Sequence, residues 1–242
     1  MSRGAALSLY ALLVLIWSST WVAIKIGLED APALLGAGVR FALAGALLLG
    51  YAALRRRPLQ TDRLLALILG LLPFAFCYGL VYWGEQYIPS GLAAVLFGVL
   101  PLYVALLGAA FLPDQPLRAA DLDAIVLNGW GMLIGGGLLL ALSGATEDWG
   151  DAVWGAKAIG SILYLAVVGS AVAFVTLTIL LREMSAQASS FIALLIPFGA
   201  LSFGALFYDE AITGRAVAGA ALVVAGLIAA RGRVRAREPI AA

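Results

Sequence analysis

The sequence predicts an all-α polytopic membrane protein, built as an inverted-repeat bundle of eight transmembrane helices. Of its 242 residues, 63% are hydrophobic and only 12% are charged. A soluble domain is about half apolar and about a quarter charged, and a chain of this composition could not bury its apolar surface in water. Two further observations complete the prediction: eight long apolar stretches, and a repeat inside the chain.

Each apolar stretch is long enough to cross a bilayer, for which a helix needs about 20 mostly apolar residues. Helices are favoured because they satisfy their own backbone hydrogen bonds in lipid, and the alternating pattern of barrel strands is not present. The first stretch is too long for a cleaved signal peptide and no small-residue cleavage site follows it. The last is the shortest, and Arg215 near its start would lie at the interface. The predicted helices cover residues 5–27, 33–54, 64–84, 91–112, 124–144, 155–181, 186–208 and 213–230.

The basic residues predict the orientation of the bundle. If the N-terminus is inside, 11 of the 15 basic residues lie at the inner ends of helices, including Arg55–Arg57 and the tail at 231–237. The opposite connections are acidic: Glu29, Asp30, Glu147, Asp148, Asp151, Asp209 and Glu210. By the positive-inside rule both termini are cytoplasmic, in a bacterial inner membrane. The short connections leave no room for a soluble domain.

Residues 90–117 and 185–212 resemble one another. When Pro101 is aligned with Pro197, Gly108 falls on Gly204, Phe111 on Phe207 and Asp114 on Glu210. Similar composition could produce such matches, but a duplicated unit is the stronger interpretation. In the topology above the two copies run in opposite directions, and inverted repeats are typical of transporters.

Several stretches resemble the EamA-like family of the drug/metabolite transporter superfamily. They are LIWSSTWVAIKIGL (15–28), the segment 31–49 with Arg40, IPSGLAAVLFGVLPLYVALLGAAFL (88–112), VGSAVAFVTL (168–177), 184–213 and GAALVVAGLI (219–228). The family has ten helices in two inverted repeats, so this chain lacks the counterparts of its fifth and sixth. The first repeat is expected at 1–116, with helices 1–4. The second is expected at 117–242, where helices 5–8 resemble the family's helices 7–10.

Ionisable side chains inside the membrane cost roughly 2.5–3.5 kcal/mol at mid-helix and so need an explanation. Lys25, Arg40 and Glu85 all fall in one layer of the outer leaflet. The functional interpretation is a vestibule in which Lys25 or Arg40 attracts a carboxylate or phosphate. The alternative is that Lys25 reaches the headgroups and Arg40 forms a structural pair with Glu85.

Polar and aromatic side chains complete the candidate solute site. Ser18, Trp21 and Lys25 share one helix face, and Tyr78, Tyr82 and Glu85 share another. The resemblance implies that the first helix lines the central pathway, although its hydroxyls could simply bond to their own helix. The candidate substrate-binding residues are Trp17, Ser18, Trp21, Lys25, Arg40, Tyr78, Tyr82, Glu85, Asn128 and Gln187. Pro101 and Pro197 are candidate hinges, with tolerated packing as the alternative.

The leading hypothesis is a secondary transporter that exports small organic metabolites, such as amino acids or drugs, by alternating access. The alternative is a truncated membrane scaffold of the same family that does not transport. We expect no enzyme, no cofactor and no metal site, because the chain has no histidine and only one cysteine, Cys77. The expected partners are a small-molecule solute and membrane lipid, with a homodimer left open and nucleic acid excluded.

Overall fold

The computed structural model describes residues 2–98, 123–183 and 186–235, and its described elements are all helical. The first half contains α1 (Arg3–Gly27), α2 (Ala33–Leu54), α3 (Arg63–Leu69), η1 (Gly70–Cys77), α4 (Tyr78–Glu85) and α5 (Ser90–Phe97). The second half contains α7 (Ala124–Thr146), η3 (Trp149–Asp151), α8 (Ala156–Ala166), η4 (Val167–Val172), α9 (Ala173–Glu183), α10 (Ala186–Tyr208) and α11 (Gly214–Arg235).

The fold class predicted from the sequence is confirmed. Within the described residues, five helices are long and apolar enough to cross a membrane: Gly4–Gly27, Ala33–Leu54, Arg63–Glu85, Ala124–Thr146 and Ala156–Leu180. Two shorter apolar helices, Leu194–Tyr208 and Gly214–Gly226, accompany them. The predicted helix 91–112 begins at Ser90 and is described to Phe97, whereas the rest of it, with Pro101, lies outside the described residues. The count of eight helices therefore stays a prediction.

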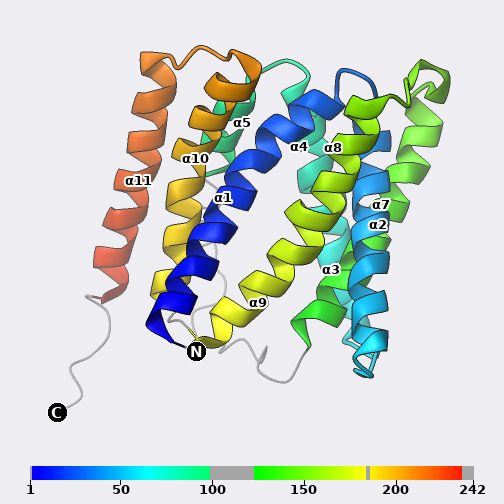
Figure 1. The fold of residues 1–242 in the computed structure, drawn as a ribbon, viewed down its shortest axis with the longest axis horizontal. Coiled ribbons are helices and arrows are strands. Elements are labelled where there is room, and N and C mark those ends of the chain that lie inside the picture. Colours follow the sequence, from blue (N-terminus) through cyan, green and yellow to red (C-terminus); the bar gives the residue numbers. More distant parts are fainter. Residues whose placement is uncertain (1, 99–122, 184–185, 236–242) are drawn as a thin grey trace.

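The helices stand side by side in one bundle (Figure 1). The connections α1–α2, α4–α5, α7–α8 and α10–α11 gather at one end, which we call the loop end. α1 begins and α11 finishes at the opposite end, the termini end. Lys25 and Glu85, near the last turns of α1 and α4, belong to the loop-end half of the bundle.

Two of the predicted helices are interrupted by π-helical segments, which the hydropathy pattern did not reveal. η1 separates α3 from α4 and contains Pro73, whose ring removes one helical hydrogen bond. η4 separates α8 from α9 and contains Gly169 and Ser170. The offset of 96 residues that aligns Pro101 with Pro197 places η4 on residues 71–76, inside η1. The two interruptions are thus equivalent in the repeat, and π segments occur frequently at functional sites.

Equivalent helices of the two halves pack against each other in antiparallel pairs. In the α2–α7 pair, Gly38 lies against Leu140, while Gly45 lies against Gly129 and Leu133. α5 pairs with α10 in the same way: Gly91 lies against Leu201, and Gly98 against Pro197. The described part of the helix predicted to contain Pro101 therefore runs opposite to the Pro197 helix, as an inverted repeat requires.

Glycines bring α2 and α7 into close contact. A Cβ atom on Gly136 would lie 2.5 Å from the backbone nitrogen of Ala42 and 2.9 Å from the carbonyl oxygen of Gly38. Its neighbour Gly135 faces η1 instead, where Phe74 and the carbonyl oxygen of Gly70 occupy the space. Small residues let helix backbones approach in this way, where water cannot drive the association. Gly135 and Gly136 therefore place α7 against η1 and α2 respectively.

At the loop end, a carboxylate from the second half caps a helix of the first half in two places. The Glu147 carboxylate, after α7, accepts hydrogen bonds from the backbone amides of Leu34 (2.8 Å) and Leu35 (2.9 Å) in α2. The Glu210 carboxylate, after α10, accepts them from the amides of Ser90 (2.6 Å) and Gly91 (3.0 Å) in α5. Both helices follow a proline and have no side-chain cap of their own. These carboxylates therefore satisfy amides that the helices leave free, and they complement the positive helix ends.

We expect Glu147→Gln to destabilise the folded protein by about 1–2 kcal/mol, because it removes the charge and one of the two acceptor oxygens. The effect is measured as the melting temperature of the detergent-purified protein. Asp151→Asn is the control, because Asp151 is an exposed carboxylate of the same connection. Equal melting temperatures for Glu147→Gln and the control would contradict the capping role.

Candidate solute-binding site

Arg40 is a buried cation on α2, in the loop-end half of the bundle. Its side chain is 2% exposed. Nε donates a hydrogen bond to Ser170 Oγ (3.3 Å) in η4, and Nη1 donates one to Tyr82 Oη (3.3 Å) in α4. Both partners are neutral, and within the described parts of the chain no carboxylate forms an ion pair with Arg40. The guanidinium therefore keeps its charge and three of its five N–H donors available.

Arg40 also stacks with aromatic rings. The guanidinium carbon lies 4.9 Å from the centre of the Phe41 ring and 5.3 Å from that of Tyr78. Such cation–π contacts stabilise a cation that has left water. The η4 backbone approaches closely here: a Cβ on Gly169 would lie 2.8 Å from Thr20 and 3.8 Å from Arg40 Nη2. The π segment thus brings Ser170 within reach of Arg40.

Lys25 and Glu85 lie beside Arg40 and Tyr82, as the sequence predicted for one layer. Lys25 Nζ donates hydrogen bonds to the carbonyl oxygens of Glu85 and Ile88, at the end of α4. Glu85 is fully buried, and its carboxylate oxygens have no hydrogen-bond partner in the part of the chain that the structure describes. Among the described residues no ion pair joins Arg40 to Glu85, so the structural pair considered as an alternative is not formed. Lys25 turns toward the bundle rather than toward headgroups.

Seven aromatic side chains form two series of ring contacts that start on α1 and meet at Phe41, and we call this set the aromatic circle. Trp17 and Trp21 stand one turn apart on α1 and begin its two arms. One arm runs Trp17–Phe174–Phe74–Phe41, with ring centres 6.0, 6.0 and 5.3 Å apart. The other runs Trp21–Phe97–Tyr78–Phe41, with spacings of 5.3, 6.0 and 4.9 Å. The arms meet at Phe41, next to the Arg40 guanidinium, so charged and aromatic groups adjoin at one place.

The other candidate residues lie apart from Arg40. Ser18 is buried against α10, where its hydroxyl donates a 3.4 Å hydrogen bond to the Ile196 carbonyl. Asn128 donates to the Ala124 carbonyl of its own helix (2.7 Å). Gly129, the next residue, packs against Leu48 and Leu49, so Asn128 lies about two turns nearer the termini end than Arg40. The Gln187 side chain and Pro101 lie outside the described part of the chain. Pro197 is buried within the continuous helix α10, and its hinge role stays a prediction.

Several residues of this site were not predictable from the sequence. Ser170 lies in the quoted stretch VGSAVAFVTL, where a hydroxyl amid apolar residues was its only signal. Phe41, Phe74, Phe97 and Phe174 carried no signal, since phenylalanine is common on any membrane helix. The neighbouring hydroxyls Ser19 and Thr20 do bond back to their own helix, at the carbonyls of Ile16 and Trp17 (both 2.7 Å).

At the loop end, a polar cluster links the α1–α2 connection to α8, to α10 and to the α7–α8 connection. Glu29, in the α1–α2 connection, accepts hydrogen bonds from Lys157 Nζ of α8 and from the Tyr208 hydroxyl at the end of α10. The backbone amide of Val153 donates to the Asp30 carbonyl (2.7 Å) beside it. Hydrogen bonds from Lys157 and Tyr208 lower the pKa of the Glu29 carboxyl below its ordinary value. Because the cluster ties α1 to both α8 and α10, separation of these helices would require it to break.

Glu29→Gln should lower the melting temperature slightly at neutral pH, because this exposed ion pair is weak. The folded-state pKa of Glu29 is lowered, so its contribution is present above the unfolded pKa and is lost as pH falls through the folded pKa. The two proteins should therefore converge at acidic pH. Scans of melting temperature against pH measure this, and a difference that persists in acid would contradict it.

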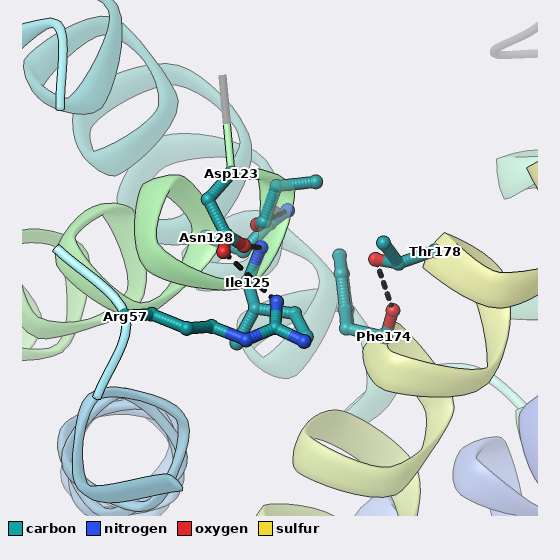
Figure 2. A network of polar contacts seen from close by, with 7 residues as sticks. Arg57, Asp123, Ile125, Asn128, Phe174 and Thr178 are labelled. Carbon is teal, nitrogen blue, oxygen red and sulfur yellow. Dashed lines mark hydrogen bonds and ion pairs between the residues drawn. The ribbon is translucent and has the colours of Figure 1, made fainter. Parts of the chain in front are cut away.

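A second ion pair lies at the termini end (Figure 2). Arg57 Nη1 and Asp123 Oδ2 are 2.8 Å apart, and Asp123 also caps α7 by accepting from the Ile125 amide (3.0 Å). Partial burial alone would raise the pKa of Asp123, but the hydrogen bonds from Arg57 and Ile125 lower it overall. Figure 2 also shows Asn128 on α7 and Thr178 on α9, each bonded to a carbonyl of its own helix. Within the described ranges, an ion pair between distant segments thus lies at each end of the bundle.

The sequence of the chain is similar to that of known membrane transporters. The model of the EamA-like transporter family matches the chain twice, at residues 4–119 and 115–231. The uncharacterized inner membrane transporter YedA of Escherichia coli K12 is 36% identical over 165 residues, which are 64% of this chain and 53% of YedA. The probable terminal-alkyne amino-acid exporter of Streptantibioticus cattleyicolor is 25% identical over 194 residues, which are 79% of this chain and 61% of the exporter. The chain thus spans little more than half the length of these relatives.

One solved crystal structure shares the fold. It superposes with a TM-score of 0.67 over 98% of this chain and 100% of its own, at 16% sequence identity. The described helices of this chain therefore adopt an arrangement found in another protein. The boundary between repeats after residue 116 stays a prediction.

Proposed function

Because the chain belongs to the EamA-like transporter family, we propose that it is a secondary transporter that exports amino acids with apolar side chains by alternating access. The buried Arg40 guanidinium, which forms no ion pair with any described residue, carries this proposal. A solute carboxylate supplies the bidentate acceptor that the described residues around Arg40 do not provide. The aromatic circle beside it offers apolar surface for the side chain of the solute.

The inverted repeat supports transport by alternating access. Two equivalent halves can exchange inward-open and outward-open arrangements around one site. In the described conformation the Glu29 cluster joins α1, α8 and α10 at the loop end, so its contacts must break before the loop end opens. The positive-inside pattern assigns the loop end to the periplasm and both termini to the cytoplasm of an inner membrane. The amino-acid exporter among the relatives supports the substrate class, and the name of YedA supports the membrane.

The proposal is tested by counterflow in proteoliposomes that contain the full chain. Vesicles loaded with unlabelled L-phenylalanine should accumulate external radiolabelled L-phenylalanine, whereas empty liposomes should not. Unlabelled L-leucine should compete, and phenethylamine, which lacks the carboxylate, should not. If folded protein gives no counterflow with any apolar amino acid, the proposal is rejected, and the transport-incompetent scaffold becomes the better description of this chain.

A further inference from the structure

Glu85 differs from the other glutamates of the loop end. Glu29, Glu147 and Glu210 each accept at least two hydrogen bonds. Glu85 is 0% exposed, and both of its carboxylate oxygens are without a hydrogen-bond partner among the described residues. An ionised carboxylate in such a position lacks both water and donors, which is costly. The described conformation therefore favours a neutral Glu85 that holds a proton.

Charged groups from three elements surround Glu85. Lys25 approaches it from α1, Arg40 from α2 and Glu210 from the α10–α11 connection. On its own helix, Tyr82 lies one turn earlier and accepts the hydrogen bond from Arg40. Arg40 therefore contacts the residue that lies one helical turn before Glu85 on the same helix. A cation and a carboxyl group on neighbouring turns suit a small solute that carries two opposite charges.

We propose that Glu85 is the coupling residue of the transporter, where a proton and the ammonium group of the solute compete for one carboxylate. This rests on the proposed function, in which Arg40 binds the carboxylate of the same solute. When the amino acid binds, the Glu85 O–H bond breaks, its proton passes to water, and the carboxylate pairs with the ammonium group. When the amino acid leaves, Glu85 takes up one proton from the side to which the site is open. No electrons are transferred, and one proton moves against each amino acid.

This competition gives the transport a direction. In the periplasm, where protons are more abundant, Glu85 is protonated and the solute is released. In the cytoplasm the proton is lost and the solute binds. The inward proton gradient therefore drives export, without any nucleotide.

The test is a pair of measurements on the detergent-purified full chain. L-Phenylalanine binding is measured over a series of pH values, and proton release is measured by calorimetry in two buffers of different ionisation enthalpy. The wild-type affinity should weaken by about tenfold per pH unit below the titration of Glu85, with about one proton released per solute bound. Glu85→Gln should bind more weakly at high pH, without pH dependence or proton release. Asp151→Asn, an exposed carboxylate of the α7–α8 connection, should behave as wild type.

A second variant distinguishes loss of the titratable carboxyl group from loss of the folded structure. Glu85→Asp keeps a titratable carboxyl group, so it should still release a proton while its pH profile shifts. Wild-type binding and counterflow without pH dependence or proton release would overturn the role of Glu85 and leave the proposed function intact. If Glu85→Gln releases protons like wild type, the coupling role is also rejected. If the folded wild type binds no amino acid, the proposed function fails, and the role of Glu85 fails with it.

Discussion

We expect Arg40→Ala to abolish transport of amino acids while leaving a folded, membrane-inserted protein. The guanidinium is the buried cation to which we assign the solute carboxylate, and loss of a buried charged partner costs about 2–5 kcal/mol, or about 30-fold or more in affinity. Folding should survive, because the described hydrogen-bond partners of Arg40 are neutral and its charge is itself a cost to insertion. Counterflow of L-phenylalanine in proteoliposomes measures the loss, and size-exclusion chromatography checks the fold.

Two variants sharpen this result. Arg40→Lys should restore little activity, because one ammonium group cannot reproduce the planar fork that contacts Ser170, Tyr82 and the solute together. Arg215→Ala removes an exposed arginine near the start of α11 and should transport as wild type. Normal counterflow by Arg40→Ala would reject the assignment of the carboxylate to Arg40.

The second large effect is expected when a single methyl group is added at Gly136. Gly136→Ala should prevent α2 and α7 from packing, because its Cβ would lie 2.5 Å from the Ala42 nitrogen, and backbone cannot rotate aside as a side chain can. Overpacking typically costs 1–3 kcal/mol, and we expect about 3 kcal/mol or more where two backbones meet. The readouts are the yield of monodisperse protein and its melting temperature.

The adjacent glycine provides a matched control. A Cβ on Gly137 would meet nothing within 4 Å, so Gly137→Ala should leave the melting temperature unchanged or raise it slightly. The two variants make the same chemical change at neighbouring positions of one helix. Equal behaviour of the pair would show that the α2–α7 contact is looser than described.

The sequence predicted the helices well because hydropathy and helix length are both set by the bilayer. It also placed Lys25, Arg40 and Glu85 in one layer, because residue counting along a helix gives depth directly. Their partners were not predictable in the same way. Ser170 lies near Arg40 because it belongs to a π-helical segment, and a hydropathy pattern does not reveal such segments. In the first half, Pro73 was a sequence signal for the corresponding π-helical segment.

The other contacts that were not predicted join segments that lie far apart in the sequence. The sequence assigned Glu147 and Glu210 only to acidic connections, yet each carboxylate reaches a helix more than 100 residues earlier. A signal was present, since α2 and α5 each follow a proline that offers no side-chain cap. Pattern alone shows that such a helix end needs an acceptor, but only the fold identifies which acidic residue supplies it.

The two carboxylate caps also have a consequence for synthesis at the ribosome. α2 and α5 enter the membrane before Glu147 and Glu210 exist, so the nascent first half carries helix ends whose amides are satisfied only by water. That half reaches its final stability when α7 and α10 have been inserted and their carboxylates bind. The second half thus completes the first, and co-expressed fragments divided between the two halves should protect each other from proteolysis in the membrane.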